Sequence, residues 1–445
     1  MRYERGMKVT STHWVNGALL GLLVAAMAAA CGSEDGRKHV QPDGGGAGGA
    51  GAGGEGGAKP VTNGGDRTQP VGGGGQPVEP SGGQGGTPAG AAAGEGGAPI
   101  VVGMGGVPSG GAGGAGGAPE ELPLVDCEPV VFADSRLEDA IRTALDKSGP
   151  LTLADMVSLT SLDARGYGIE SLSGIECFSE VTELDLGYGG ASNQVTNFAP
   201  LRYLKKLAHL DLTRNPVQTL EPLGELPSLQ RLTLSDDAVD SVSLSPLASA
   251  PALVRLDLDG NELGDLTPLG NIATLREVWL TNSALTAPAS LSAITQVERL
   301  YLSGTQLTDA TPLAALTKLT ELEIEGNPDL ANFNALSTLT NLTHLNAGYT
   351  DITSITAVAS MTKLTTLSLH FDQVADISPL QGLTQLQFLA LNFNPVTDIA
   401  PLVANTGLGA GDTVNLAGTS LNCPTQGANV TALVNRQVTV YSPCN

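Results

Sequence analysis

One leucine pattern recurs eleven times in this chain and limits the folds open to it. The pattern is LxxLxLxx, then Asn, Asp, Ser or Thr, then any residue, then Leu, Val or Ile. Most copies begin 22 residues apart, and three intervals are 26, 24 and 23 residues. A period of this length predicts a solenoid, in which each coil buries its leucines only against neighbouring coils. The copies begin at Leu159, Val181, Leu207, Leu229, Leu253, Leu275, Val297, Leu319, Leu342, Leu364 and Leu386.

Each position of the pattern has a physical role. Leu256 and Leu258 lie two residues apart on a predicted strand, so both point to the interior. The ninth position follows the strand, where an asparagine amide can donate to and accept from the backbone of stacked coils. Asparagine stands there at Asn215, Asn261, Asn327 and Asn394, and is replaced by Asp237, Ser283, Thr305, Thr350 and Asp372. Later prolines favour short 3₁₀ turns: Pro200, Pro222, Pro246, Pro268, Pro312, Pro379 and Pro401.

The second half of the units, as in TPLAAL (311–316) and SPLQGL (378–383), resembles the internalin-like subclass of bacterial leucine-rich repeat proteins. The resemblance covers residues 130–445, roughly. We therefore expect an α/β solenoid: a right-handed superhelix with a parallel β-sheet on its concave face and short 3₁₀ turns on its convex face. The resemblance also implies a role in protein–protein interaction or adhesion.

A solenoid needs caps because its terminal repeats would otherwise expose their core. We expect an N-terminal cap over 120–158, repeats over 159–407, and a last partial repeat with a C-terminal cap over 408–445. Ser135 and Glu138 have the spacing of a capping box, and they predict a short amphipathic helix over 135–147. Little other α-helix is expected.

Cys127, Cys423 and Cys444 lie in these cap regions, and the departure from the pattern at 172–178 places Cys177 close to the N-terminal cap. Four cysteines allow three disulfide connectivities. Eleven strands at about 4.8 Å each separate the two ends by about 50 Å, far beyond disulfide reach. The geometry therefore favours Cys127–Cys177 and Cys423–Cys444. Four free buried thiols are the alternative, although disulfides are usual in exported proteins.

The N-terminus has the features of an export signal. Basic residues precede an apolar run from Ala18 to Ala30, which is too short to span a bilayer. The sequence Ala28-Ala29-Ala30-Cys31-Gly32 resembles a bacterial lipobox, with Ala28 where Leu is usual, so we expect a signal peptide over 1–30 and lipidation of Cys31. Ordinary cleavage after Ala30 is the alternative.

Residues 31–119 are predicted to form a disordered tether. Residues 44–117 contain 33 glycines and no Phe, Tyr or Trp, so they have too little apolar surface to offset the entropy of ordering. An acidic residue directly after the lipidated cysteine favours retention at the inner membrane in Gram-negative export systems. Gly32 stands there, so we expect anchoring in the cell envelope with outer-membrane or surface display.

The charge of the chain and the absence of catalytic motifs disfavour several classes of function. Residues 120–445 carry 15 Lys or Arg and 37 Asp or Glu, a net charge of −22 that disfavours nucleic-acid binding. The sequence lacks HExxH, GxSxG, the phosphate-binding GxxxxGK and CxxC, so no catalytic residue or cofactor is predicted. His344 and His370 are placed on neighbouring strands, but a metal site needs three or four ligands, and none is expected.

The outward positions of the strands are the candidates for binding a ligand. The third, fifth and seventh residues of each pattern face away from the core, so folding constrains them least. Trp279 and Tyr301 are predicted to be exposed on neighbouring strands, and we interpret Trp279, Tyr301, Arg299 and Glu321 as a binding patch. The simpler interpretation of the charges is a surface ladder of little energy, Arg255–Glu277–Arg299–Glu321.

Together these features predict a lipid-anchored, non-enzymatic protein whose concave face binds a protein or glycan. Its only expected membrane contact is the lipid anchor. The alternative is a structural spacer of the cell envelope with no specific ligand.

Overall fold

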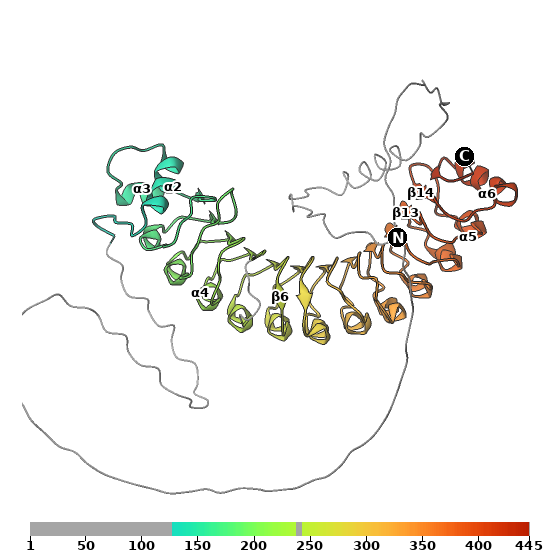
Figure 1. Ribbon diagram of the computed structural model, residues 1–445, viewed down its shortest axis with the longest axis horizontal. Coiled ribbons are helices and arrows are strands. Elements are labelled where there is room, and N and C mark those ends of the chain that lie inside the picture. Colours follow the sequence, from blue (N-terminus) through green and yellow to red (C-terminus); the bar gives the residue numbers. More distant parts are fainter. Residues whose placement is uncertain (1–126, 237–242, 445) are drawn as a thin grey trace, which may run out of the picture. The chain divides into compact units, whose positions relative to one another are not determined.

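The computed structural model describes residues 127–236 and 243–444 (Figure 1). The predicted signal peptide, the lipidation site Cys31 and the predicted tether 31–119 lie outside the described residues. So does Asp237, one of the residues that replace asparagine at the ninth position.

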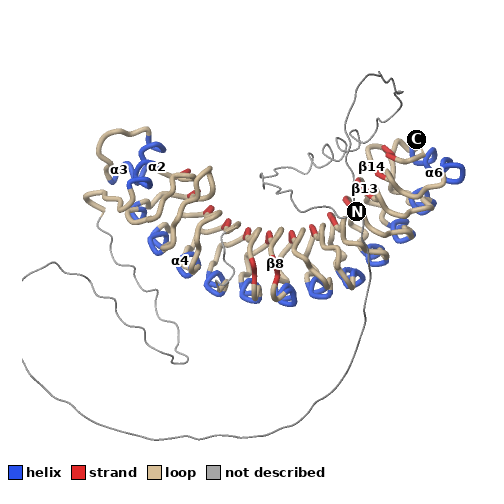
Figure 2. The backbone as a smooth tube through the Cα atoms, viewed as in Figure 1, coloured by secondary structure: helices blue, strands red, loops and turns tan. Residues whose placement is uncertain are grey.

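The described residues form a curved stack of coils whose strands line the concave side (Figure 2). Thirteen parallel strands in these residues make one sheet, and sequential coils pair in register, as in Leu256 opposite Val278. The strands are β1 (Ser161–Asp163), β2 (Glu183–Asp185), β3 (His209–Asp211), β4 (Arg231–Thr233), β5 (Arg255–Asp257), β7 (Glu277–Trp279), β9 (Arg299–Tyr301), β10 (Glu321–Glu323), β11 (His344–Asn346), β12 (Thr366–Ser368), β13 (Phe388–Ala390), β14 (Thr413–Asn415) and β15 (Thr439–Tyr441). The prediction of a parallel sheet is confirmed.

A second, two-stranded sheet joins two coils outside the main sheet. It pairs β6 (Glu262–Leu263) with β8 (Ala284–Leu285).

Short helical turns occupy the convex side, as the prolines predict. In eight of these turns a proline stands in the first turn of the helix, where its missing N–H costs no hydrogen bond. Most are 3₁₀ helices: η1 (Ile175–Cys177), η2 (Ala199–Tyr203), η4 (Ser245–Ser249), η5 (Thr267–Asn271), η6 (Pro288–Ala293), η7 (Thr311–Ala315), η8 (Phe333–Thr338), η9 (Thr356–Ser360) and η10 (Ser378–Gly382). Two are short α-helices, α4 (Glu221–Gly224) and α5 (Ala400–Ala404).

The core is a continuous leucine stack between the sheet and these turns. The first, fourth and sixth residues of the pattern are buried, as in Leu253, Leu256 and Leu258, which are 0% exposed. Burying one such side chain contributes roughly 1.5–3 kcal/mol, and each coil supplies several. The stack therefore depends on contacts between neighbouring coils.

The ninth-position residues form the expected ladder of hydrogen bonds. Asn394 accepts from the Val374 N–H at 2.9 Å and donates to the Leu369 and Leu391 carbonyls at 2.6 and 3.1 Å. Asn193 makes the same kind of bonds in a longer repeat, although its spacing hides it from the pattern. These amides satisfy buried backbone groups where the strands end.

The N-terminal cap is a helical layer over the first coil. Helix α2 (Ser135–Leu145) buries Leu137, Ala140 and Ile141 against it. The predicted cap residue is wrong by one position: Asp134 is the N-cap, and its carboxylate accepts from the Arg136 N–H at 2.9 Å. The same carboxylate accepts from the Glu170 N–H at 2.7 Å, which links the cap to the repeats.

A second helix of the N-terminal cap, α3 (Leu153–Ser158), was not predicted from the sequence. The Thr152 N–H donates to the Asp155 carboxylate at 2.7 Å and so caps this helix. The Cys127–Cys177 disulfide joins the chain before α2 to the turn η1.

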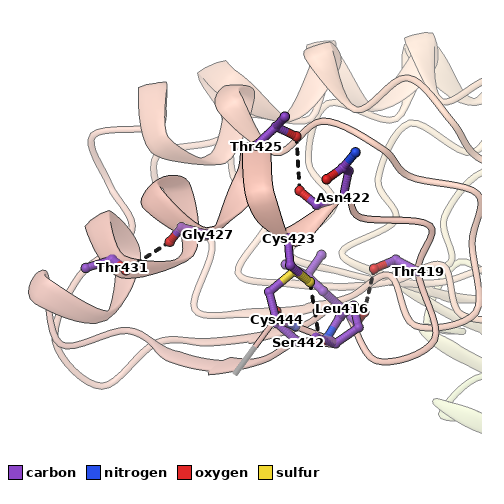
Figure 3. Close-up of a disulfide and its surroundings, with 10 residues drawn as sticks. Leu416, Thr419, Asn422, Cys423, Thr425, Gly427, Thr431, Ser442 and Cys444 are labelled. Atoms are coloured by element: carbon purple, nitrogen blue, oxygen red, sulfur yellow. Dashed lines mark hydrogen bonds between the residues drawn. A yellow bond between two sulfur atoms is a disulfide. The ribbon is translucent and has the colours of Figure 1, made fainter.

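The C-terminal cap contains the longest described helix, α6 (Cys423–Asn435), which corrects the expectation of little α-helix. Val430 and Leu433 are its buried residues. Arg436 donates to the carbonyls of Asn405 and Val403 at 2.9 and 2.6 Å, and so ties the cap to the last repeat. The Cys423–Cys444 disulfide joins the start of α6 to the segment after β15, as Figure 3 shows. Both predicted disulfide pairings are present.

Candidate binding surface

The predicted concave patch is a tightly connected cluster on β5, β7 and β9. Trp279 stacks on the Tyr301 ring with centroids 3.9 Å apart, and the Arg255 guanidinium lies 4.6 Å from the Trp279 ring centroid. The indole Nε1–H donates to Glu277 at 2.7 Å. The Trp279 ring therefore has its stacking partner and its cation within the chain, and its N–H group has its hydrogen-bond acceptor there too.

The prediction that both aromatic residues are exposed is wrong. Tyr301 is only 7% exposed, because it lies under its neighbours on the adjacent strands, and Trp279 is half-buried. Burial and the charges of Glu321 and Glu277 raise the pKa of the Tyr301 hydroxyl, which hydrogen-bonds to Glu321. Of the four predicted residues, Arg299 offers an open side chain, 47% exposed.

Glu277 is the electrostatic centre of this patch. Its carboxylate pairs with Arg299 at 2.7 Å and with Arg255 at 3.3 Å. Burial acts to raise the pKa of Glu277, but hydrogen bonds from Trp279 and Arg299 and the two arginine charges outweigh it, so the pKa lies below its usual value. The predicted charge ladder is thus real across β5, β7 and β9, and its acid is buried rather than on the surface.

Three stacked aromatic rings follow the strands of later repeats, and the sequence analysis missed them. We call Tyr349, Phe371 and Phe393 the aromatic column. Their ring centroids are 4.5 and 4.2 Å apart, with interplanar angles of 11° and 16°. The side chains are 45%, 37% and 51% exposed. The recurrence of an aromatic residue at the eighth position of three successive repeats was the available signal.

The eighth position has an unusual backbone throughout the solenoid. Its φ is positive at every described repeat from Arg214 onward, between 55° and 75°. The N–H of each residue donates to the seventh-position carbonyl of the next repeat, as from Phe371 to Asn392 at 3.0 Å. Glycine or asparagine adopts this conformation readily, whereas an aromatic residue costs roughly 1–2 kcal/mol.

Folding alone therefore gives no reason for three exposed rings at this position. Strained residues whose side chains do not serve the core are candidates for function. Stacking between the rings recovers part of the cost, at about 0.5–1.5 kcal/mol per pair.

Polar groups border the aromatic column on the seventh position. His370 lies perpendicular to the Tyr349 ring at 5.2 Å, and its Nε2 is 3.4 Å from the Glu325 carboxylate. Burial acts to raise the pKa of Glu325, but hydrogen bonds from His370 and Asn346 lower it below its usual value. A buried amide oxygen, Asn392 Oδ1, has no hydrogen-bond partner.

Comparisons with known proteins agree with this architecture. A family model described as leucine-rich repeats in two copies matches residues 340–382 and 362–404. The crystal structure of an internalin from Listeria monocytogenes is 28% identical, with a TM-score of 0.60 over 70% of this chain and 90% of that one. This chain has a leucine-rich repeat fold similar to that of an internalin.

Other comparisons support the fold of this internalin-like chain or add nothing. A leucine-rich repeat protein from Leptospira interrogans is 19% identical, with a TM-score of 0.51 over 65% of this chain and 79% of that one. At that identity the likeness concerns the fold alone. Among curated proteins, no relative matches the chain.

Two kinds of site were also sought in the part of the internalin-like chain that the structure describes. No group of three or more His, Cys, Asp or Glu side chains there is placed to hold a metal ion. None of the helices in residues 127–236 and 243–444 has the length and apolar character needed to cross a bilayer. His344 and His370 do not form a pair: they contact Thr343 and Ser368, respectively, at 2.9 and 2.8 Å.

Proposed function

We propose that this internalin-like chain is a non-enzymatic binding protein that captures a protein partner with its concave face and the adjoining aromatic column. Solenoids of this kind offer extended concave surfaces that suit protein partners. The aromatic column carries the proposal. It places three exposed rings in a row at a position whose positive φ strains an aromatic residue but not a glycine. Exposed aromatic clusters are typical of binding hot spots.

The concave patch belongs to the same proposal. Arg299 supplies an exposed guanidinium on a rigid support, and Trp279, Tyr301 and Glu321 hold that support in place. A preorganised surface loses little conformational entropy when it binds.

We further propose that the chain is exported and lipid-anchored at Cys31, with display on the outer membrane or cell surface. The lipobox-like sequence and Gly32 support this part of the proposal. The tether would then hold the repeats away from the membrane, at a root-mean-square reach of about 50 Å.

Affinity capture with the full-length chain tests the binding function. We expect a partner that the wild type retains and that Tyr349→Ala loses, with an unchanged melting curve. Tyr188→Ala is the matched control, because Tyr188 is 46% exposed at the other end of the solenoid. A spacer would enrich no partner. Equal loss in both variants, or loss in neither, would contradict binding through the aromatic column.

A further inference from the structure

One place beside the aromatic column is left uncovered. Side chains at the eighth position lean over the glycine of the next repeat: Asp236 over Gly260 and Asn282 over Gly304, each so close that a Cβ there would clash. Over Gly326 there is no such side chain, and a Cβ would meet only the Gly304 backbone, at 3.6 Å. One face of the Tyr349 ring stacks on Phe371, so its other face is turned toward this open position. We call the space between Asn282 and Tyr349 the Gly326 slot.

The slot has room for at least one planar group. Neighbouring rings of the aromatic column are 4.5 and 4.2 Å apart, and one repeat separates each pair. Two glycines, Gly304 and Gly326, separate Asn282 from Tyr349, so two successive repeats lack a side chain at the eighth position. A flat group that enters there would continue the stack.

Elsewhere this chain shows which flat group accompanies such a ring. The Arg214 guanidinium lies 4.4 Å from the Tyr188 ring centroid and pairs with Asp236 at 3.2 Å. The Arg255 guanidinium lies 4.6 Å from the Trp279 ring centroid and pairs with Glu277. Both sites combine a ring, a guanidinium and a carboxylate, from three successive repeats at the first site and from two at the second.

At Tyr349 the chain supplies the ring and a nearby carboxylate of this arrangement, but the Gly326 slot beside the ring receives no arginine side chain from the preceding eighth positions, which are glycines. Glu325 precedes Gly326, and its charge is close enough to add to burial in raising the pKa of the Tyr349 hydroxyl. Asn346 donates to Glu325 Oε2 at 2.7 Å, and His370 Nε2 lies 3.4 Å from Oε1. These two contacts fix the carboxylate, whose side chain remains 37% exposed and can accept a further donor. Glu321 and Glu323 add further acidic groups on β10.

We propose that the Gly326 slot receives an arginine side chain of the protein partner, stacked on the free face of Tyr349 and paired with Glu325. The proposal rests on the proposed function and adds the chemistry of the partner, a basic segment that presents arginine. An arginine guanidinium is planar and stacks on aromatic faces, whereas a lysine ammonium does neither. The net charge of −22 over residues 120–445 favours a cationic partner.

Peptide binding to the immobilised full-length chain tests the slot directly. The probes are three peptides of the form acetyl-GXGXGXG-amide, with arginine, lysine or citrulline at X, at physiological ionic strength. We expect the arginine peptide to bind about threefold to tenfold more tightly than either of the others. Citrulline keeps the plane without the charge, and lysine keeps the charge without the plane.

Variants of the chain locate the binding. Tyr349→Leu and Glu325→Gln should each remove the preference for arginine. Gly326→Arg should remove it too, because its own side chain fills the slot, and Arg214 shows that arginine is tolerated at a φ of 63°. Phe393→Leu is the control: it removes an exposed ring at the far end of the aromatic column, and the preference should persist.

Equal affinities for the three peptides, or a preference that survives Tyr349→Leu and Gly326→Arg, would overturn the slot. If the chain captures a partner through the aromatic column but shows no arginine preference, the slot fails and the proposed function stands. If the arginine preference appears but no partner is captured, the slot stands as an arginine-binding site and the proposed function fails.

Discussion

Asp372 shows how one residue can adapt to a position that suits asparagine. It occupies the ninth position, where Asn394 in the next repeat donates to two carbonyls. Asp372 Oδ1 accepts from the Thr350 N–H at 2.8 Å, while Oδ2 is buried with no partner. At the equivalent place Asn394 has its amide nitrogen, a donor, and an ionised carboxylate oxygen cannot donate. Burial raises the pKa of Asp372 to about 7, although hydrogen bonds from Thr350 act to lower it. The neutral acid can donate a hydrogen bond where the amide does.

Asp372→Asn should therefore stabilise the protein above neutral pH. The folded-state pKa lies above the ordinary aspartate value of 3.8. The stabilisation that the neutral acid gives is therefore complete below about pH 4 and is lost as pH rises through 7. An amide has no such titration and supplies the missing donor at all pH values. We expect a gain of roughly 1–3 kcal/mol in unfolding free energy at pH 8 and a smaller difference at pH 5.

Chemical denaturation at the two pH values measures this difference. Thr305→Asn is a suitable comparison, because Thr305 occupies the same ladder without a carboxyl group and should show no pH-dependent gain. A pH-independent effect of Asp372→Asn would mean that the aspartate is ionised in the folded state.

For single residues, the sequence predicted the buried leucines and the asparagine ladder well, because both recur at a fixed spacing. It predicted exposure poorly. Tyr301 alternates outward on its strand and is still buried, because Trp279 on the next strand covers its ring. Pattern gives the direction of a side chain, but the size and chemistry of neighbours in adjacent repeats decide whether solvent reaches it.

The strands and turns follow from the repeat, whereas the caps do not. Residues 135–147 were predicted to be helical and the structure has α2 at Ser135–Leu145, yet the helix α6 was missed. Its sequence, CPTQGANVTALVN, contains glycine, threonine and asparagine and lacks a clear apolar stripe. Contacts of Val430, Leu433 and Arg436 with the last repeat stabilise it instead, and tertiary contacts of this kind leave no periodic signal in one sequence.

The C-terminal disulfide should hold this cap in place. Replacing Cys423 and Cys444 by serine opens a bridge that spans 21 residues, so we expect a loss of about 3 kcal/mol in the stability of the cap. Because repeats contact mainly their neighbours, the loss should be local. Hydrogen exchange should show α6 and β15 opening faster, while β1 to β10 keep their protection.

The matching pair of substitutions at Cys127 and Cys177 is the control. It should loosen α2 and leave α6 unchanged. Uniform acceleration of exchange in both variants would show that the solenoid unfolds as one cooperative unit.

Across the whole molecule, the side chains that stabilise the fold differ from those that face solvent. Effects of a substitution on binding can therefore be measured separately from its effects on stability. Arg299→Ala removes an exposed guanidinium, while Glu277 keeps its bonds to Trp279 and Arg255. The free energy of unfolding should therefore fall by only about 1–2 kcal/mol, because the buried Glu277 carboxylate keeps two of its three partners. Partner affinity should fall severalfold if the concave patch is part of the binding surface.

Arg276→Ala is the matched control for Arg299→Ala. Arg276 pairs with Glu298 at 3.2 Å at the second position of the pattern, next to the strand rather than on its outward face. Equal affinities of the two variants would place the partner on the aromatic column alone. Tyr301→Ala is a poor test of the patch, because the loss of a buried ring would itself destabilise the fold.

The lipid anchor concerns the chain as a whole, because it decides where the solenoid can meet a partner. Cys31 follows a short apolar run and three alanines, and in a lipoprotein its thiol is the atom that carries the lipid. Serine keeps the size of the side chain but lacks that thiol. Cys31→Ser should therefore move the protein from the membrane fraction to the soluble or secreted fraction, as fractionation and immunoblotting would show.

Ser33→Ala, two residues further on, should leave the protein with the membranes. Addition of acidic side chains after the cysteine gives a second test of location. Gly32→Asp should reduce display on intact cells, measured by accessibility to an external protease, without releasing the protein from membranes. If Cys31→Ser still sediments with membranes, another part of the chain holds it there, and the lipid anchor is wrong. If Gly32→Asp leaves surface accessibility unchanged, the anchor can stand, but residue 32 does not determine the final membrane.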